Sequence, residues 1–145
     1  MFERILVAVD GSEGSKKALR VASKLQQTCG GELLLLTVYR HHSLLEASMS
    51  MVRPEDPQSL DDSMRAYAKE VAEDAKTIAA EAGAGKVRAF VKGGQPARTI
   101  VKFGEEHKAD LIIVGSRGQG DMQGFLLGSV SHKVTSLAAT PVMVV

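Results

Sequence analysis

Residues 111–129 read Leu-Ile-Ile-Val-Gly-Ser-Arg-Gly-Gln-Gly-Asp-Met-Gln-Gly-Phe-Leu-Leu-Gly-Ser, an apolar run followed by a glycine-rich loop. A helical pattern of apolar residues follows directly, at Val130, Val134, Leu137 and Ala138. Glycines allow backbone N–H groups to approach a ligand, and a helix N-terminus adds unpaired donors and a partial positive charge. The stretch therefore predicts a strand, a loop and a helix that together bind a phosphate, most simply that of a nucleotide.

Similar apolar runs recur along the chain. The five expected strands are Ile5–Val9, Leu33–Val38, Val87–Val91, Leu111–Val114 and Val142–Val145. Most are continuous rather than alternating, which is typical of strands buried on both faces. Segments of helical period separate them, around 18–29, 64–78 and 96–104 and after Gly128. This alternation predicts one α/β domain, residues 1–145, with a parallel sheet that binds ligands at the carboxyl ends of its strands.

Residues 41–62 interrupt this pattern with few periodic positions. We expect an irregular excursion there, and the sequence leaves open whether it is a lid over the site or a disordered surface loop. Its adjacent histidines, His41 and His42, do not predict a metal site. Neighbours on an irregular segment do not converge on an ion without further ligands.

Composition narrows the function classes. The 145 residues include 18 basic and 17 acidic side chains, and a net charge of +1 argues against nucleic acid or a membrane surface as partner. No apolar run approaches the roughly 20 residues of a membrane span, and the N-terminus lacks the shape of a signal peptide. The single cysteine, Cys29, excludes an intrachain disulfide. These features together favour a cytoplasmic protein.

Several nucleotide signatures are absent. No Gly-x4-Gly-Lys-Ser/Thr occurs, which excludes a P-loop ATPase, and no His-x-Gly-His pair occurs either. The spacing Gly118-x-Gly120-x3-Gly124 differs in context from a dinucleotide fingerprint, because that fingerprint opens a βαβ unit and is followed by an acidic residue. What remains is Gly115-x2-Gly118-x9-Gly128-Ser129.

With this spacing the chain resembles the universal stress protein family, in particular its ATP-binding branch. Five patches carry the resemblance in the family's order: Val9-Asp10-Gly11-Ser12, Gly94-x-Pro96-Ala97-x2-Ile100, the run from Ala109 to Gly118, Gly128-Ser129-Val130-Ser131 and Thr140-Pro141-Val142. The resemblance implies an open five-stranded parallel sheet of order 3-2-1-4-5 with helices on both faces, an adenine nucleotide alpha hydrolase-like architecture. It also implies ATP as ligand, with Mg²⁺ carried by the phosphates.

The resemblance assigns each part of the nucleotide to particular residues. The implied binding residues are Ala8, Asp10, Val38, Gly115, Arg117, Gly118, Gly128, Ser129, Val130 and Ser131. The glycines and the start of the following helix would hold the phosphates, and Arg117 would reach a phosphate or the ribose. Asp10 would lie near the ribose or the metal, while Ala8 and Val38 would line the adenine slot. For Asp10 and Ser12 a purely structural role as helix caps is the alternative.

The resemblance implies a nucleotide-dependent regulator of the stress response. No general base can be identified in the sequence, so we expect at most slow ATP hydrolysis. One alternative is a dimeric protein-interaction module in which nucleotide binding is incidental. Another is a binder of a different adenylate, such as cyclic AMP. The last strand, Val142–Val145, is apolar and predicts a sheet edge, so we expect a homodimer formed through it.

Overall fold

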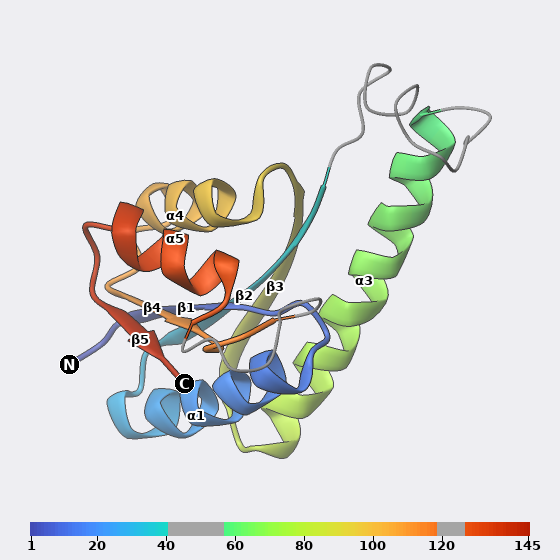
Figure 1. The fold of residues 1–145 in the computed structure, drawn as a ribbon. Helices are drawn as coiled ribbons and strands as arrows, with labels where there is room; N and C mark the ends of the chain where they lie inside the picture. The colour runs from blue at the N-terminus through green and yellow to red at the C-terminus, as the bar shows by residue number, and fades with distance from the viewer. Residues whose placement is uncertain (41–56, 119–126) are drawn as a thin grey trace.

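In the computed structural model, which describes residues 1–40, 57–118 and 127–145, five parallel strands form one sheet (Figure 1). The strands are β1 (Arg4–Ala8), β2 (Glu32–Tyr39), β3 (Lys86–Gly93), β4 (Leu111–Val114) and β5 (Val142–Val144). Their order across the sheet is β3-β2-β1-β4-β5. The expected order 3-2-1-4-5 is therefore confirmed, and each strand begins and ends within two residues of the apolar run that predicts it.

Four helices in the described part of the chain cover the sheet, two on each face (Figure 1). Helices α1 (Glu13–Cys29) and α3 (Pro57–Glu81) lie on one face, and α4 (Pro96–Glu106) and α5 (Ser129–Leu137) lie on the other. Along β1, Ile5 and Val7 pack toward the α1–α3 layer and Leu6 toward the α4–α5 layer. Both faces of the strand are thus buried, as continuous apolar sequence requires. None of the helices in the described residues is long and apolar enough to cross a membrane.

Helix α3 packs on the sheet through small side chains. Its buried contact face consists largely of alanines, at Ala68, Ala72, Ala75 and Ala79. The helix begins at Pro57, so the expectation of irregular structure as far as residue 62 is wrong for residues 57–62. Proline suits a first helical turn, because the N–H it lacks would be unpaired there. The rest of that segment, residues 41–56, with both histidines and the expected lid, lies outside the described residues.

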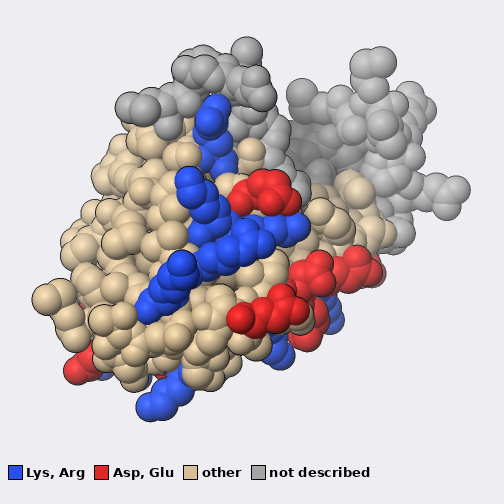
Figure 2. All heavy atoms as spheres, turned by 90° about the horizontal axis from the view of Figure 1, so that it is seen from below, with Lys and Arg blue, Asp and Glu red and all other residues tan. Residues whose placement is uncertain are grey.

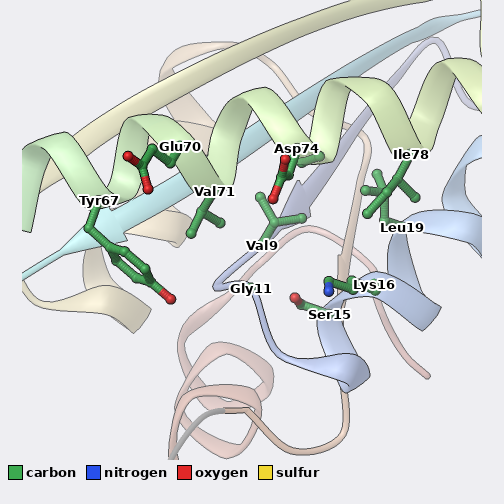
Figure 3. Close-up of a pocket in the computed structure, with 11 residues that line it drawn as sticks. Val9, Gly11, Ser15, Lys16, Leu19, Tyr67, Glu70, Val71, Asp74 and Ile78 are labelled. Atoms are coloured by element: carbon green, nitrogen blue, oxygen red, sulfur yellow. The ribbon is translucent and has the colours of Figure 1, made fainter.

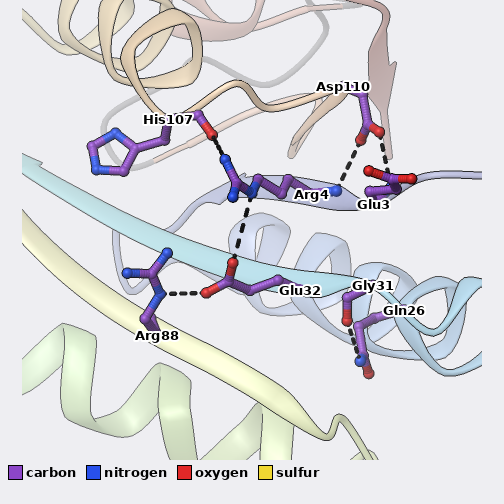
Figure 4. Close-up of polar contacts among 8 residues, drawn as sticks. All are labelled: Glu3, Arg4, Gln26, Gly31, Glu32, Arg88, His107 and Asp110. Carbon is purple, nitrogen blue, oxygen red and sulfur yellow. Dashed lines mark hydrogen bonds and ion pairs between the residues drawn. The ribbon is translucent and has the colours of Figure 1, made fainter.

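A polar network joins the amino ends of the central strands (Figure 4). Asp110, just before β4, accepts a hydrogen bond from the backbone N–H of Arg4 at 3.1 Å. The Arg4 guanidinium donates to the carbonyl oxygen of His107 at 2.9 Å and lies 3.9 Å from the Glu32 carboxylate. Glu32 also pairs with Arg88 on β3. Strands β1, β2, β3 and the entry to β4 are therefore cross-linked at the end opposite the predicted site.

A buried amide joins three elements nearby. Gln26, near the end of α1, is only 4% exposed. Its Nε2 donates to the carbonyl oxygen of Gly31 at 2.7 Å (Figure 4), and its Oε1 accepts from the N–H of Gly85 at 3.1 Å. The amide thus links the end of α1 to the segments that lead into β2 and β3.

Replacing this amide should destabilise the fold. We expect Gln26→Met, which keeps the length of the side chain, to lower the free energy of unfolding by about 1–3 kcal/mol, because two backbone groups lose their partner. Urea denaturation would measure the change. The neighbouring Gln27→Met is the control. Gln27 is exposed, and water can replace its hydrogen bond to the carbonyl oxygen of Ala82, so its loss should cost about 0.5 kcal/mol or less. Equal effects of the two substitutions would contradict the role given to Gln26.

Candidate functional site

A cavity of about 490 Å³ opens at the carboxyl ends of β1, β2 and β4. Nine of the ten predicted binding residues line it: Ala8, Asp10, Val38, Gly115, Arg117, Gly118, Ser129, Val130 and Ser131. Gly128, the tenth, is the N-cap of α5 and is not among the lining residues. The fold therefore brings residues from four separate stretches of sequence to one hollow, whose volume falls in the usual range for small-molecule sites.

Ser116 holds the described parts of the glycine-rich loop together. Its carbonyl oxygen accepts from the N–H of Gly128 at 2.6 Å and from the hydroxyl of Ser131 at 2.9 Å. Its own N–H donates to the carbonyl oxygen of Val145 at 2.7 Å. The Ser131 hydroxyl thus has a structural task that the sequence did not indicate. Residues 119–126 of the loop lie outside the described residues.

Helix α5 starts at the cavity without a side-chain cap. Its N-cap is Gly128, in an extended conformation, and Ser129 and Val130 form the first positions of the helix. A helix start of this kind can take an anion where a cap would otherwise accept hydrogen bonds. Together with the backbone of Gly115 and Gly118, it gives the cavity a wall suited to phosphate.

A tight turn after β1 forms the adjoining part of the wall. Asp10 Oδ1 accepts from the N–H of Ser12 at 2.9 Å and from its hydroxyl at 2.5 Å. Ser12 is the N-cap of α1 and accepts from the N–H of Ser15 at 3.2 Å, as expected for a capping serine. Gly11, between them, has a φ of 85°, which a residue without Cβ adopts readily. Asp10 therefore both lines the cavity and orients the cap of α1.

Part of the cavity wall was not predicted. Helix α3 contributes Ser63, Met64, Tyr67, Ala68 and Val71, and β2 contributes Thr37. The helical period of α3 predicts core positions for the last four of its residues in this set, yet Tyr67 is 56% exposed. Only the position of Thr37 at the carboxyl end of an apolar run hints at the site.

A smaller groove of about 130 Å³ lies between α1 and α3 (Figure 3). Its floor is apolar, and its rim carries Lys16, Glu70 and Asp74. Lys16 lies 3.5 Å from the carboxylate of Glu13. The groove and the cavity share Val9, Ser15, Tyr67 and Val71 in their walls, so the two hollows adjoin at the end of β1.

Charge on the α1–α3 face is mixed. Lys17, Arg20 and Lys24 are exposed along α1, and Figure 2 shows a row of basic side chains with acidic side chains beside it. Positive and negative charges at this spacing largely cancel at a distance, which fits the net charge of +1. The face therefore produces no long-range field of a single sign.

The described residues contain no group of three or more His, Cys, Asp or Glu side chains that could hold a metal ion. Mg²⁺ bound with a nucleotide needs only one or two carboxylates, because phosphates and water supply its other ligands. Asp10 is the one carboxylate among the described lining residues of the cavity. The residues present therefore fit a Mg²⁺ ion that arrives with phosphates.

Comparison with known proteins places this geometry in a family. The sequence profile of the universal stress protein family matches residues 1–145. The universal stress protein YxiE of Bacillus subtilis is 36% identical over 148 residues, which cover 100% of this chain and 99% of that protein. A universal stress protein of Thermus aquaticus, from the QAH/OAS sulfhydrylase 3′ region, is 34% identical over 149 residues, covering 100% and 99%.

Solved structures of related proteins have a similar fold. The structure of MJ0577, a protein of Methanocaldococcus jannaschii, superposes with a TM-score of 0.83 at 30% identity and covers 100% of this chain and 96% of that one. A universal stress protein in complex with cAMP superposes with a TM-score of 0.73 at 26% identity, covering 99% and 96%. The fold of the chain is thus shared with solved structures of this family.

A close backbone contact holds the glycine-rich loop against α1 and can be tested. A Cβ on Gly14, in the first turn of α1, would overlap the carbonyl oxygen of Arg117, and one on Gly115 would lie 2.8 Å from the carbonyl carbon of Gly14. We expect Gly14→Ala to destabilise the protein by about 1–3 kcal/mol, despite the better helix propensity of alanine. Chemical denaturation measures the loss, and hydrogen exchange should increase at residues 115–118.

The matched control is Gly104→Ala in α4. A Cβ there meets only the flexible ends of Ile112 and Leu6, at 3.3 and 3.4 Å. This substitution should change stability less and should leave exchange in the loop unaltered. A Gly14→Ala variant as stable as the parent, with unchanged loop exchange, would show that the contact is not required.

Proposed function

Because the chain belongs to the universal stress protein family, we propose that the cavity binds ATP, with Mg²⁺ carried by the phosphates, and that its occupancy regulates a stress response. The observation that carries the proposal is the convergence of nine predicted residues on one cavity. The cAMP bound to a related structure supports an adenine nucleotide as the class of ligand. ATP-dependent regulation of this kind would act in the cytoplasm, where ATP is available.

In this proposal the phosphates lie at the end of β4. The backbone of Gly115 and Gly118, the start of α5 at Ser129 and the cation of Arg117 surround that space. Backbone donors and a helix N-terminus stabilise anions without a dedicated side chain. Asp10, at the end of the neighbouring strand β1, would contact the ribose or the Mg²⁺ ion.

The adenine would lie at the carboxyl ends of β1 and β2. Ala8 and Val38 pack toward the α4–α5 layer, beside Pro96 and Ile100, which also line the cavity. These apolar side chains would cover the faces of a purine ring, and the backbone of Val38 would bond to its edge. Base recognition through backbone leaves no side-chain signal, so the adenine assignment rests on the family resemblance.

Binding and release, rather than fast hydrolysis, is the regulatory event that we propose. Rapid ATP hydrolysis needs a group that positions or deprotonates the attacking water. Asp10, the one carboxylate on the described wall, already accepts two hydrogen bonds from Ser12.

Competition among ATP, AMP and cAMP would identify the preferred adenylate, because the number of phosphates decides how much of the loop is filled.

A charge at the start of α5 tests phosphate binding. We expect Ser129→Glu to lower ATP affinity at least about tenfold, since a carboxylate would stand where the phosphates bind. The fold should be retained, because an acidic residue in the first turn of a helix is favourable. Isothermal titration with Mg²⁺-ATP is the measurement.

His132→Glu is the control for this test. His132 is exposed on the same helix but does not line the cavity. Its replacement adds the same charge one turn away from the loop, and ATP affinity should change by about twofold or less. If Ser129→Glu binds ATP as well as the parent does, the phosphates do not bind at this helix.

The edge of the sheet supports a homodimer as part of the function. Strand β5 pairs with β4 alone among the described strands. The N–H of Val145 donates to Val114 and the carbonyl oxygen of Pro141 accepts from Ile112, so these residues face β4. By the alternation of a strand, the backbone groups of Val144 face outward, where a second copy can pair with them.

Proline at Val144 tests this interface. Val144→Pro removes one outward N–H and no hydrogen bond to β4, so we expect a folded monomer where the parent is a dimer. Sedimentation velocity gives the oligomeric state, and circular dichroism checks the fold. A Val144→Pro variant that remains a dimer would place the interface elsewhere.

A further inference from the structure

The hydroxyl of Thr37 is buried without a hydrogen-bond partner. The residue is 4% exposed, and its Oγ1 is the one buried side-chain nitrogen or oxygen among the described residues that lacks a partner. A buried hydroxyl without a partner destabilises the folded protein, whereas valine has nearly the same shape and no such cost. Leu33–Leu36, directly before it, are all apolar. The missing partner therefore points to something that the protein binds.

Thr37 lies on the face of the sheet that α3 covers. Leu33 and Leu35 of β2 pack toward the α1–α3 layer, so Thr37, two residues further, continues their row. With Thr37, the cavity wall on this side is formed by Val9 and, from α3, by Ser63, Met64, Tyr67, Ala68 and Val71; we call these residues the α3-side subsite. Figure 3 shows Tyr67 and Val71 extending from α3 toward the end of β1. No side chain of the α3-side subsite is charged.

A nucleotide bound as proposed would leave the α3-side subsite empty. Ala8 and Val38, the adenine residues, pack toward the opposite face of the sheet. The phosphates belong at the loop after β4. Asp10, expected beside the ribose, directly follows Val9 of the α3-side subsite. A substituent on the ribose would therefore enter the α3-side subsite.

Resting on the proposed nucleotide function, we propose that the α3-side subsite binds an uncharged, largely apolar group carried on the ribose of an adenine nucleotide, with the Thr37 hydroxyl as its hydrogen-bond partner. A charged group would lose its hydration there without compensation. A lone water molecule fits less well, because buried waters need two to four polar partners. Rotation about χ1 moves the Thr37 hydroxyl to another staggered position, from which it can turn to the ligand.

The probe is ATP with an N-methylanthraniloyl group on its ribose, an uncharged aromatic substituent with an N–H and a carbonyl group. We expect the parent protein to bind this analogue about tenfold more tightly than ATP, because the ring is removed from water. Thr37→Val should weaken binding of the analogue about three- to tenfold and change ATP affinity by less than about twofold. Fluorescence titration and competition with ATP give both affinities.

Thr99→Val is the matched control. The Thr99 hydroxyl donates to the carbonyl oxygen of Gln95 at 2.7 Å, and Thr99 does not line the cavity. Its replacement should lower the melting temperature and preserve both affinities. Thr37→Val should instead leave the melting temperature of the ligand-free protein unchanged or raise it, because a hydroxyl without a partner is removed. A purely structural role for Thr37 would give the opposite sign.

The outcomes distinguish a failure of the α3-side subsite from a failure of the proposed nucleotide function. A parent protein that binds ATP but prefers the analogue no more than ATP would overturn the α3-side subsite and leave the proposed function intact. Equal losses of ATP and analogue in Thr37→Val would place Thr37 against the nucleotide itself and would also overturn it. A parent protein that binds neither compound overturns the proposed function and this inference with it.

Discussion

The pairing of β1 with both β2 and β4 is the constraint on which the site depends. Ile5 is in register with Leu33 on one side and with Leu111 on the other. The chain therefore builds the sheet outward from β1 in one direction, returns, and continues in the other. At such a reversal the loops after the two central strands leave toward opposite faces and open a crevice between them. The cavity forms there because strand order requires it, before any side chain contributes chemistry.

Close backbone contact converts that crevice into a defined cavity. Gly14 and Gly115 allow the first turn of α1 and the loop after β4 to touch without side chains between them. Ser116 then fixes the loop to the start of α5 through its carbonyl oxygen. The walls that face a phosphate are thus held by main-chain geometry. This explains why glycine and serine, rather than charged residues, dominate the motif.

The sequence predicts the strands of this molecule better than the side chains that line its cavity. Apolar runs predict all five strands, and most of these runs are continuous because a strand buried on both faces admits few polar residues; β3, at the sheet edge, also carries Arg88. The spacing from Gly115 to Ser129 predicts the phosphate wall, since backbone needs create a glycine pattern. Thr37, Ala68 and Val71 escape prediction because a strand residue and a helical stripe look alike whether they face a core or a hollow. The exposure of Tyr67 likewise depends on where the covering layer ends, which is a property of the assembled layers and not of local period.

The loop that would hold phosphate is also bonded to the edge strand. Ser116 donates its N–H to the carbonyl oxygen of Val145, one residue beyond β5, while its carbonyl oxygen accepts from Gly128 at the start of α5. A ligand that draws the loop toward itself therefore acts on the same backbone that presents β5 to a second copy. Coupling of this kind is reciprocal: if occupancy strengthens dimerisation, dimerisation must strengthen binding by the same factor. The hydrogen bond between Ser116 and Val145 thus joins the proposed nucleotide site directly to the proposed interface. It is the shortest route by which binding at one could affect the other.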